Sequence, residues 1–274
     1  GHCTFCNPAC IAALGYRKSS DLLGKNMHAL IHHSHANAQP YPVEECPIFR
    51  AFQKGVSCRI SDEVFWRANG TSFPVEYSSH PQVVGGNTVG AVVVFMDITE
   101  RKAAEEKIKH MAQYDTLTEL PNRALFSDRL RQALAAAARN QTKVALMYID
   151  LDKFKPINDQ HGHDVGDLVL KEAALRMTRM ARKSDTVARI GGDEFVIMLP
   201  DNTDKDRALI VAEKIRQALR EPIFIQNLNL NISASIGIAV FPEHGSSELE
   251  LSKHADQAMY RAKKTGRDRI ESAD

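Results

Sequence analysis

Two adjacent carboxylates beside a pair of glycines are the residues of this chain best suited to bind a metal ion. Gly191 and Gly192 lie between two apolar runs, which predicts a tight β-hairpin. Asp193 and Glu194 follow the glycines, where the chain enters the second strand. A carboxylate against a hydrophobic sheet costs free energy unless it is paired, so a divalent cation is one expected partner. The alternative is that both acids are solvated at the tip of the hairpin.

A second acidic stretch follows another predicted strand. The apolar run 144–149 predicts this strand, and Asp150, Leu151 and Asp152 come directly after it. Carboxylates are the ligands that Mg²⁺ usually takes from a protein. Asp150 at a strand end and Asp193 at the hairpin could therefore converge on one ion. For Asp152 we favour a different role, as an acid that caps a helix or closes a turn.

The second part of the chain carries motifs that resemble those of GGDEF-type diguanylate cyclase domains. The resemblance extends from Asp115 to Ile270, and it is specific because six motifs occur in one order. They are Asp115-x-Leu117-Thr118-x-Leu120-Pro121-Asn122-Arg123, the run 150–155, Asn158-Asp159 with 162–167, the run 191–195, Ser235-Ile236-Gly237, and the run 255–267. Position 193 is Asp, where many relatives have Glu.

The resemblance implies a reaction and a set of metal ligands. Two GTP molecules, one on each protomer of a homodimer, would be condensed to cyclic di-GMP with release of two pyrophosphates. The Asp150 and Asp193 carboxylates and the Leu151 carbonyl would bind Mg²⁺ or Mn²⁺. Glu194 matches a residue that binds metal or activates the attacking 3′-hydroxyl, and Lys155 completes the implied catalytic set.

The resemblance also implies how the triphosphate would be bound. The segment Lys153–Lys155 offers backbone N–H groups and cations to a triphosphate. Lys155, Lys263 and Arg267 match positions that bind phosphates in the family. Without the resemblance, Lys263 and Arg267 would be interpreted as favourable charges at the C-terminus of a helix.

Three further residues are assigned to the nucleotide by the resemblance. Asn158 and Asp167 match residues that recognise guanine, and a carboxylate can accept hydrogen bonds from guanine N1–H and N2–H₂, which adenine lacks. By itself, Asp167 would be an acid of a first helical turn. Phe154 is grouped with the substrate-binding residues, although an aromatic residue beside an apolar strand is also typical of a core.

Arg182 and Asp185 form an Arg-x-x-Asp pattern whose position resembles the product-inhibition site of diguanylate cyclases. Five residues, 186–190, separate Asp185 from Gly191. A guanidinium can bind phosphate or a guanine edge, and bound cyclic di-GMP would then hold the two half-sites apart. The alternative is a surface ion pair, worth less than about 1 kcal/mol.

Length and composition indicate two ordinary domains and exclude some classes of protein. The chain has 274 residues, 25% of them charged, and a net charge of +1, which argues against a dedicated nucleic-acid-binding protein. It has neither an apolar run of about 18 residues that would predict a membrane span nor a secretory signal, so we expect a cytoplasmic protein. It begins Gly1-His2-Cys3, and we expect it to be a segment of a longer protein, whose upstream part could still carry a membrane anchor.

Residues 1–99 are predicted to form a small α+β sensory domain with helices and an antiparallel sheet. A short helix is expected over 7–14 and strands over 63–67, 72–78 and 89–96. Four short motifs resemble those of PAS domains, whose first strand would be incomplete here. They are Asn7-Pro8-Ala9, Gly15-Tyr16, Asn69-Gly70 and the ending 97–102.

No ligand or cofactor of this sensory domain can be assigned from the sequence. All five cysteines lie in the first 60 residues, at positions 3, 6, 10, 46 and 58. Cys3-x-x-Cys6 could be a redox pair or half a metal site, with Cys10, Cys46 or one of His32, His33 and His35 as partners, but we favour reduced thiols. We likewise interpret 28–35 as polar residues of a variable loop rather than as haem or metal ligands.

Residues 100–113 are predicted to form a linker helix, and residues 114–274 an α/β sandwich. Ala104, Ile108 and Met111 could form a short a/d seam with a second copy, or the helix could be solvated. Alternating strands and helices predict one central sheet, and the resemblance implies a palm-like arrangement. The expected helices start at Pro121 and Gly166 or cover 208–219 and 251–264, and the expected strands cover 144–149, 186–199 and 232–241. Met180, in the helix that starts at Gly166, is expected to be buried.

The leading hypothesis is therefore a diguanylate cyclase that works as a homodimer, regulated by its PAS domain and by its product. The alternative is a binding module that has lost turnover and serves as a receptor for GTP or cyclic di-GMP or as a dimerisation partner. A further possibility is that the chain is the front part of a protein with a phosphodiesterase domain after Asp274.

Overall fold

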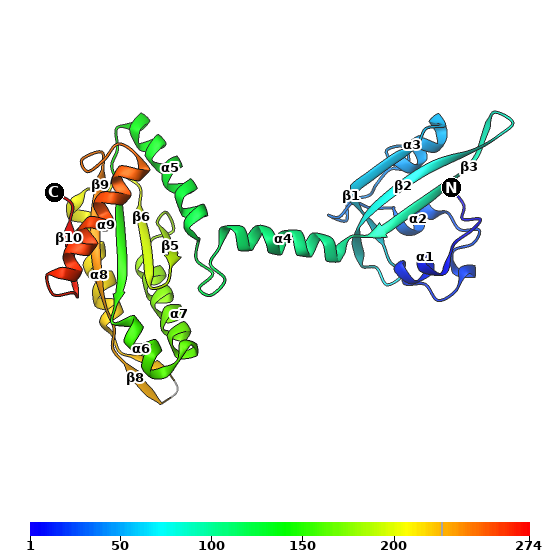
Figure 1. Ribbon diagram of the computed structural model, residues 1–274. Coiled ribbons are helices and arrows are strands. Elements are labelled where there is room, and N and C mark those ends of the chain that lie inside the picture. Colours follow the sequence, from blue (N-terminus) through cyan, green and yellow to red (C-terminus); the bar gives the residue numbers. More distant parts are fainter. Residues whose placement is uncertain (226) are drawn as a thin grey trace. The chain divides into compact units, whose positions relative to one another are not determined.

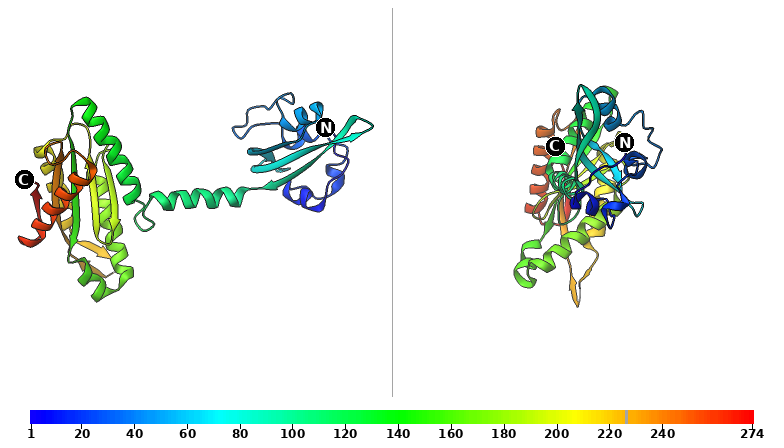
Figure 2. Two further views of the ribbon diagram at one scale, coloured as in Figure 1. Left: turned by 45° about the horizontal axis from the view of Figure 1, so that its top comes forward. Right: turned by 90° about the vertical axis from the view of Figure 1, so that its right-hand side faces the viewer.

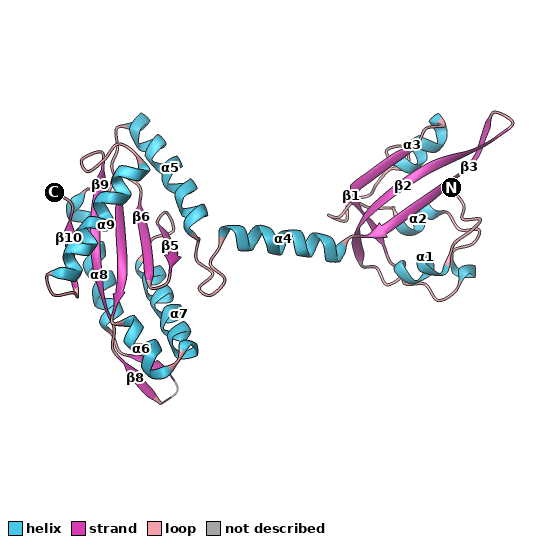
Figure 3. Cartoon of the chain, viewed as in Figure 1, coloured by secondary structure: helices cyan, strands magenta, loops and turns pink. Residues whose placement is uncertain are grey.

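The computed structural model describes residues 1–225 and 227–274, and they divide into two compact units. Unit 1 is Gly1–Lys107 and unit 2 is Ile108–Asp274. Their elements are labelled in Figure 1 and coloured by type in Figure 3. None of the helices in these described ranges is long and apolar enough to span a membrane.

Unit 1 is built on an antiparallel sheet of order β1-β2-β3, as the sequence predicted for this domain. The strands are β1 (Cys58–Trp66), β2 (Ser72–Val84) and β3 (Asn87–Asp97), each longer than expected. Alternate residues of β2, namely Phe73, Val75 and Tyr77, are buried, because successive side chains of a strand point to opposite faces. Short helices accompany the sheet: α1 (Pro8–Ala13), a 3₁₀ turn (Ser19–Asp21), α2 (Met27–Ile31) and α3 (Pro47–Lys54).

The interpretation of 28–35 as a polar loop is wrong. His28 lies within helix α2, and His32 directly follows that helix with only 2% of its surface exposed. The rings of Tyr41 and Phe65 lie 4.9 and 5.1 Å from that of His32. His32 is thus part of the interior of unit 1, whereas His33 is exposed.

Helix α4 (Thr99–Gln113) covers the predicted linker. Thr99 donates hydrogen bonds to Asp97 Oδ1 through its backbone N–H and its hydroxyl, which starts the helix at the end of β3. No residue of α4 is buried, and Ile108 and Met111 are exposed. The proposed seam with a second copy stays a prediction.

Unit 2 contains a central five-stranded sheet of order β10-β9-β4-β6-β5. Strand β4 (Val144–Asp152) lies in the middle and pairs antiparallel with β6 (Glu194–Leu199) and β9 (Ser233–Phe241). The outer strands are β5 (Thr186–Gly191) and β10 (Arg269–Ser272). Figure 2 shows this sheet from two further directions. The sequence predicted β4, β9 and the β5–β6 hairpin, and it missed β10 and a small hairpin of β7 (Ile223–Ile225) with β8 (Leu228–Leu230).

Helices cover both faces of this sheet, which confirms the predicted α/β sandwich. Alternate residues of β4 face opposite sides: Met147 and Ile149 pack in one cluster with residues of α7 (His163–Met180) and α8 (Lys205–Arg220). Val144 and Leu146 pack in another, with residues of α5 (Arg123–Asn140) and α9 (Glu248–Lys264). Asp150 and Asp152 follow Val144 and Leu146 at intervals of two residues. They therefore lie on the same face of the sheet, the one covered by α5 and α9.

Several expected boundaries in unit 2 are wrong. Helix α7 begins at His163 rather than Gly166, and Met180 at its end is 41% exposed rather than buried. Helix α5 begins after Asn122, whose side chain accepts hydrogen bonds from the N–H groups of Ala124 and Leu125, so Pro121 lies just outside it. Helix α6 (Phe154–His161) was not expected at all.

Gly237 on β9 allows α9 to lie directly on the sheet. A Cβ atom at this position would come within 2.1 Å of the Ala255 carbonyl oxygen and the Met259 nitrogen, so a larger residue would push the helix away. This close contact fixes the distance between α9 and the neighbouring strand β4. It therefore determines how near Lys263, in the last turn of α9, comes to the end of β4.

Candidate functional site

Three acidic residues converge where β4 and β6 meet. Asp150 on β4 is the register partner of Glu194 on β6, and the Leu151 N–H donates to the Asp193 carbonyl oxygen over 3.2 Å. Gly192 has φ +49°, a left-handed conformation that glycine adopts without strain. The Gly-Gly turn therefore brings Asp193 and Glu194 back beside the end of β4.

Electrostatics at this cluster favour a bound cation. Asp150 is only 7% exposed. Burial raises the pKa of Asp150 to about 6, and the nearby Asp193 and Glu194 carboxylates add to the shift. Lys263 Nζ lies 2.6 Å from Asp150 Oδ2 and opposes this rise in the pKa of Asp150. Carboxylate and carbonyl oxygens are the ligand types that suit Mg²⁺ or Mn²⁺, so Asp150, Leu151 and Asp193 fit the implied ion in their chemistry.

Asp152 is a structural residue, which corrects our expectation of a cap or turn acid. It is 2% exposed and accepts hydrogen bonds from Ser233 Oγ and Ser235 Oγ, each over 2.7 Å, and from the Asp268 N–H over 3.0 Å. Lys153, not Asp152, is the N-cap residue of α6. Asp152 therefore connects β4 to β9 and to the loop that follows α9.

We expect Asp152→Ala to lower the free energy of unfolding of unit 2 by about 3 kcal/mol. The substitution leaves two hydroxyls and one N–H without their charged acceptor, and hydrogen bonds to charged groups contribute about 1.5–3 kcal/mol each. Urea unfolding of the full chain would measure the change. Asp159→Ala, at an exposed acid of α6, is the matched control, and equal stability of the two variants would contradict this role.

Asn158 is held against the backbone of α7 with a free acceptor. A Cβ atom at Gly166 would lie 1.7 Å from Asn158 Oδ1, so only glycine permits this approach. Oδ1 is buried and has no hydrogen-bond partner among the residues that the structure describes. Asp167 is the next residue after Gly166 and is exposed. The structure thus brings together the two residues that the resemblance assigns to guanine.

Phe154 lies in the hydrophobic core. It is 7% exposed and packs in the cluster under α6 and α7. Its ring comes within 3.2 Å of the position that a Cβ atom of Gly166 would take. Its core role is therefore observed, whereas its assignment to the substrate stays a prediction.

The basic residues assigned to phosphate fall into two groups. Lys263 lies in the acidic cluster, paired with Asp150. Lys153, Lys155 and Arg267 are exposed, and within residues 1–225 and 227–274 none of them forms an ion pair. Lys153 has φ +61°, at the junction of β4 and α6. These cations are thus available to an anion near the end of β4.

Arg189 and Asp115 form a clamp on the Gly-Gly turn that sequence reasoning missed. Arg189 Nη1 donates to Asp115 Oδ1 over 3.0 Å, while its Nε and Nη2 donate to the Gly192 carbonyl oxygen over 2.9 and 2.8 Å. Burial by itself raises the pKa of the Asp115 carboxyl. Hydrogen bonds from Thr118 and Arg189 lower this pKa by more, so it lies below its usual value. In the sequence, the only indication of this pair was that Asp115 begins the first GGDEF-type motif and that Arg189 lies just before the motif at 191–195.

The Arg182–Asp185 segment lies away from the acidic cluster, ahead of β5. Asp185 Oδ2 accepts a hydrogen bond from the backbone N–H of Arg182 over 2.7 Å, and the Arg182 side chain is exposed. A recess of about 830 Å³ adjoins this turn, and Arg129, Arg139, Lys183 and Asp185 line it. Cations and one carboxylate at a shallow recess suit an anionic ligand that also donates hydrogen bonds.

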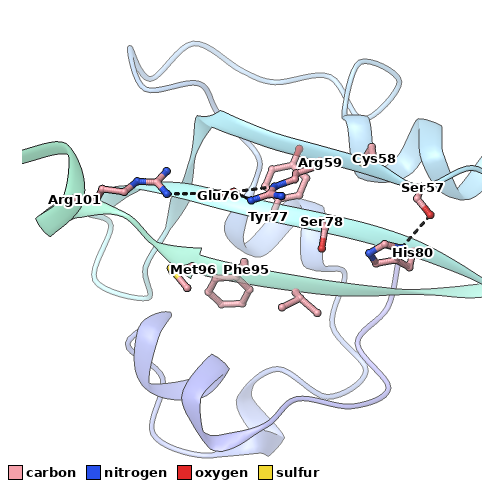
Figure 4. A pocket seen from close by; sticks show the side chains of 11 residues that line it. Ser57, Cys58, Arg59, Glu76, Tyr77, Ser78, His80, Phe95, Met96 and Arg101 are labelled. Carbon is pink, nitrogen blue, oxygen red and sulfur yellow. Dashed lines mark hydrogen bonds and ion pairs between the residues drawn. The ribbon is translucent and has the colours of Figure 1, made fainter. Parts of the chain in front are cut away.

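In unit 1, one ion pair connects the start of α4 to the sheet, and a second fixes the end of β3 that precedes α4. Arg101 Nη1 lies 2.8 Å from Glu76 Oε2, and Arg59 contacts the same carboxylate (Figure 4). Arg67 pairs with Asp97, the residue that caps α4, over 2.6 Å. A recess of about 680 Å³ lies beside Glu76 on the sheet. The first turn of α4 is thus held by Glu76 of β2 and by Asp97 at the end of β3.

Comparisons with known proteins match both units. A family model described as "Diguanylate cyclase, GGDEF domain" matches residues 112–269, and a PAS domain model matches residues 1–100. Over 169 residues the chain is 44% identical to the bifunctional diguanylate cyclase/cyclic di-GMP phosphodiesterase MucR of Pseudomonas aeruginosa. The match covers 62% of this chain and 24% of MucR, so the chain spans about a quarter of that relative.

Solved structures agree with the family models. The isolated GGDEF domain of TpbB from Pseudomonas aeruginosa is 41% identical, with a TM-score of 0.58 over 59% of this chain and 95% of that one. The coiled coil and GGDEF domain of DgcB from Caulobacter crescentus, solved in complex with c-di-GMP, is 30% identical. It has a TM-score of 0.58 and covers 64% of this chain and 93% of that one.

Proposed function

Because this chain belongs to the GGDEF diguanylate cyclase family and carries a PAS domain at residues 1–100, we propose that unit 2 condenses two GTP molecules to cyclic di-GMP. The observation that carries the proposal is the convergence of Asp150, Asp193 and Glu194 beside Lys263. Carboxylates and a cation at the end of a buried strand suit the transfer of a phosphoryl group. Since GTP is a cytoplasmic nucleotide, we propose that the domain works in the cytoplasm.

Phosphoryl transfer depends mainly on positioning and on charge stabilisation. Mg²⁺ or Mn²⁺, when bound by Asp150, Asp193 and the Leu151 carbonyl, would offset the negative charge that develops on the phosphate oxygens. Glu194 would accept the proton of the 3′-hydroxyl or contribute to metal binding. Lys155 would bind the triphosphate from the exposed end of α6.

The remaining proposed contacts orient the nucleotide. Lys263 and Arg267 would bind phosphate oxygens, supported by their place in and after the last turn of α9. Lys153 would contribute a backbone N–H and a cation at the start of α6. Asn158 Oδ1 and the Asp167 carboxylate would accept hydrogen bonds from the donor edge of guanine. Phe154 would support these two residues from its place in the core.

Each unit 2 would present one GTP, so the active form is proposed to be a homodimer. We expect the specific activity to rise with protein concentration and to level off as dimers form. Initial rates of pyrophosphate release over a series of concentrations, with the mass of the particle measured by light scattering, would check this. A constant specific activity in a sample shown to be monomeric would rule the dimer out.

We expect Arg182→Ala to relieve inhibition by cyclic di-GMP while initial turnover stays within about twofold of wild type. A guanidinium that binds phosphate or guanine contributes a charged hydrogen bond, so its loss should weaken inhibition about 10–100-fold. Initial rates with added product would measure this, with Arg179→Ala, at an exposed arginine of α7, as the matched control. Identical inhibition curves for wild type and Arg182→Ala would contradict the proposed site.

The alternative is a unit that binds GTP or cyclic di-GMP without turnover, alone or as part of a longer protein with phosphodiesterase activity. The name of MucR, which combines both activities, favours keeping this second candidate. Incubation with GTP and Mg²⁺, followed by chromatography, separates the two. Formation of cyclic di-GMP supports the cyclase, whereas saturable binding of GTP without any product supports the receptor.

A further inference from the structure

A second group of metal-ligating side chains lies inside unit 1, away from the sites described above. His28, His32 and Cys46 each offer one ligand atom, and these atoms all lie within 4.8 Å of one another. His32 and Cys46 are each only 2% exposed. Cys46 Sγ lies 3.3 Å from His32 Nδ1. Two imidazoles and a thiol meeting in a protein interior form a donor set that zinc and its neighbours in the first transition series prefer.

The local structure explains why these residues meet. His28 and His32 are four positions apart, on and directly after α2, so they lie on one side of the helix. Cys46 is the N-cap residue of α3, fixed in position by Pro47 at the start of that helix. The two helices thus present their ends to the same point in the interior.

The second nitrogen of each histidine lies beside an oxygen atom. His28 Nε2 lies 2.9 Å from the Tyr41 carbonyl oxygen, which leaves Nδ1; within residues 1–225 and 227–274, this buried Nδ1 has no hydrogen-bond partner. His32 Nε2 lies 2.9 Å from Glu63 Oε2, although not along the direction of a hydrogen bond. Histidines that bind metals usually have their other nitrogen oriented by a carbonyl or a carboxylate. Both histidines have a partner of this kind.

Glu63 is itself held in place. Its carboxylate accepts hydrogen bonds from Tyr41 Oη over 2.7 Å and from Tyr77 Oη over 2.6 Å. It therefore has a fixed position from which to orient His32. The rings of Tyr41, Phe65 and Tyr77 lie 4.9–5.9 Å from the His32 ring. This packing favours a single ion over a planar organic cofactor.

We propose that His28 Nδ1, His32 Nδ1 and Cys46 Sγ bind one divalent transition-metal ion of the zinc class inside the PAS domain. Bond lengths of about 2.3 Å to sulfur and about 2.0–2.1 Å to nitrogen put a sulfur and a nitrogen about 3.6 Å apart in a tetrahedral site. The separation of 3.3 Å between Cys46 Sγ and His32 Nδ1 is close to that value. Three protein ligands leave the fourth position of the ion open to water or to a small ligand.

The test uses the full chain, reduced and freed of metal with a chelator, and titrated with Zn²⁺ against a chromophoric chelator. We expect one tight Zn²⁺ per chain at this site. Loss of a ligand in His28→Gln or Cys46→Ser should weaken binding at least about 100-fold, and Glu63→Gln, which acts through His32, about 10–100-fold. Cys6→Ser is the matched control, because Cys6 is also a free cysteine of unit 1 but lies outside the cluster.

Substitution with Co²⁺ identifies the ligands directly. Cobalt bound through Cys46 gives a thiolate charge-transfer band, which cobalt bound to the carboxylates at Asp150 and Asp193 lacks. The band should be present in wild type and in Cys6→Ser and absent from Cys46→Ser. Circular dichroism of each metal-free variant checks folding. If Cys46→Ser does not fold, the Zn²⁺ affinity of His28→Gln, at a partly exposed position, tests the proposal instead. The proposal is overturned by unchanged Zn²⁺ affinity in folded His28→Gln, by loss of the band in Cys6→Ser, or by no binding in wild type.

Discussion

Asp193→Ala is expected to lower the rate of cyclic di-GMP formation by about 10²–10³-fold or more while the protein stays folded. The carboxylate is one of the oxygen ligands proposed for the metal, and a metal ion contributes several kcal/mol of charge stabilisation in the transition state. Asp193 lies in a turn and is partly exposed, so its loss should cost little stability. Initial rates with GTP and Mg²⁺ would measure the effect.

The matched control is Asp206→Ala, which removes an exposed acid from the first turn of α8 in the same unit. It should keep nearly the wild-type rate, whereas Asp150→Ala should lose activity as Asp193→Ala does. Thermal melting of each variant separates loss of activity from loss of folding. Near wild-type turnover by folded Asp193→Ala would show that this carboxylate does not hold the catalytic metal.

Asp167→Ala is expected to reduce the preference for GTP over ATP by about 100-fold. A site built to hydrogen-bond one edge of a base rejects an analogue that lacks the matching donors, because the polar groups of the site are then left unpaired. Asn158 Oδ1, which is buried beside Gly166 and has no hydrogen-bond partner in the described part of the chain, is the second such group. The ratio of kcat/KM for the two nucleotides measures the preference.

Asp164→Ala is the matched control for this prediction. Asp164 lies in the first turn of α7, three residues before Asp167, and is likewise exposed. Its substitution should leave the preference for GTP unchanged. Equal nucleotide preference in wild type and Asp167→Ala, or substantial product from ATP in wild type, would remove the basis for assigning Asp167 to the base.

Features set by local sequence were predictable here. The apolar run at 144–149 and the Gly-Gly pair at 191–192 predicted β4 and the β5–β6 hairpin, because strand formation and tight turns depend on neighbouring residues. Antiparallel pairing of β4 with β6 places Asp150 opposite Glu194, whereas the sequence had suggested that Asp150 converges with Asp193. The antiparallel sheet of unit 1 followed in the same way from short strands and turn residues, whereas the PAS assignment came from motifs that resemble that family.

Features set by contacts between distant residues were not predictable. Asp152 lies beside Ser233 and Ser235 only because β4 pairs with β9, and no pattern near Asp152 indicates those partners. Arg189 and Asp115 likewise meet across 74 positions of sequence. In unit 1, the short helix α2 turned His32 inward, where the sequence alone suggested a polar loop.

The Arg189–Asp115 clamp connects the segment after α4 to the Gly-Gly turn. Asp115 comes two residues after the end of α4, and through Arg189 it is connected to the Gly192 carbonyl at the turn that carries Asp193. At the other end, Arg101 and Thr99 connect the first turn of α4 to Glu76 and Asp97 of the sheet in unit 1. Side-chain contacts therefore exist at both ends of α4.

The most direct measurement is the amount of cyclic di-GMP and of pyrophosphate formed in one reaction of the full chain with GTP and Mg²⁺. The proposed condensation predicts two pyrophosphates for each cyclic di-GMP, no product when the metal is chelated, and formation by Asp193→Ala that is slower by about 10²–10³-fold or more. Bound GTP that is recovered unchanged at every protein concentration, with neither product formed, would contradict the assignment of this chain as a diguanylate cyclase.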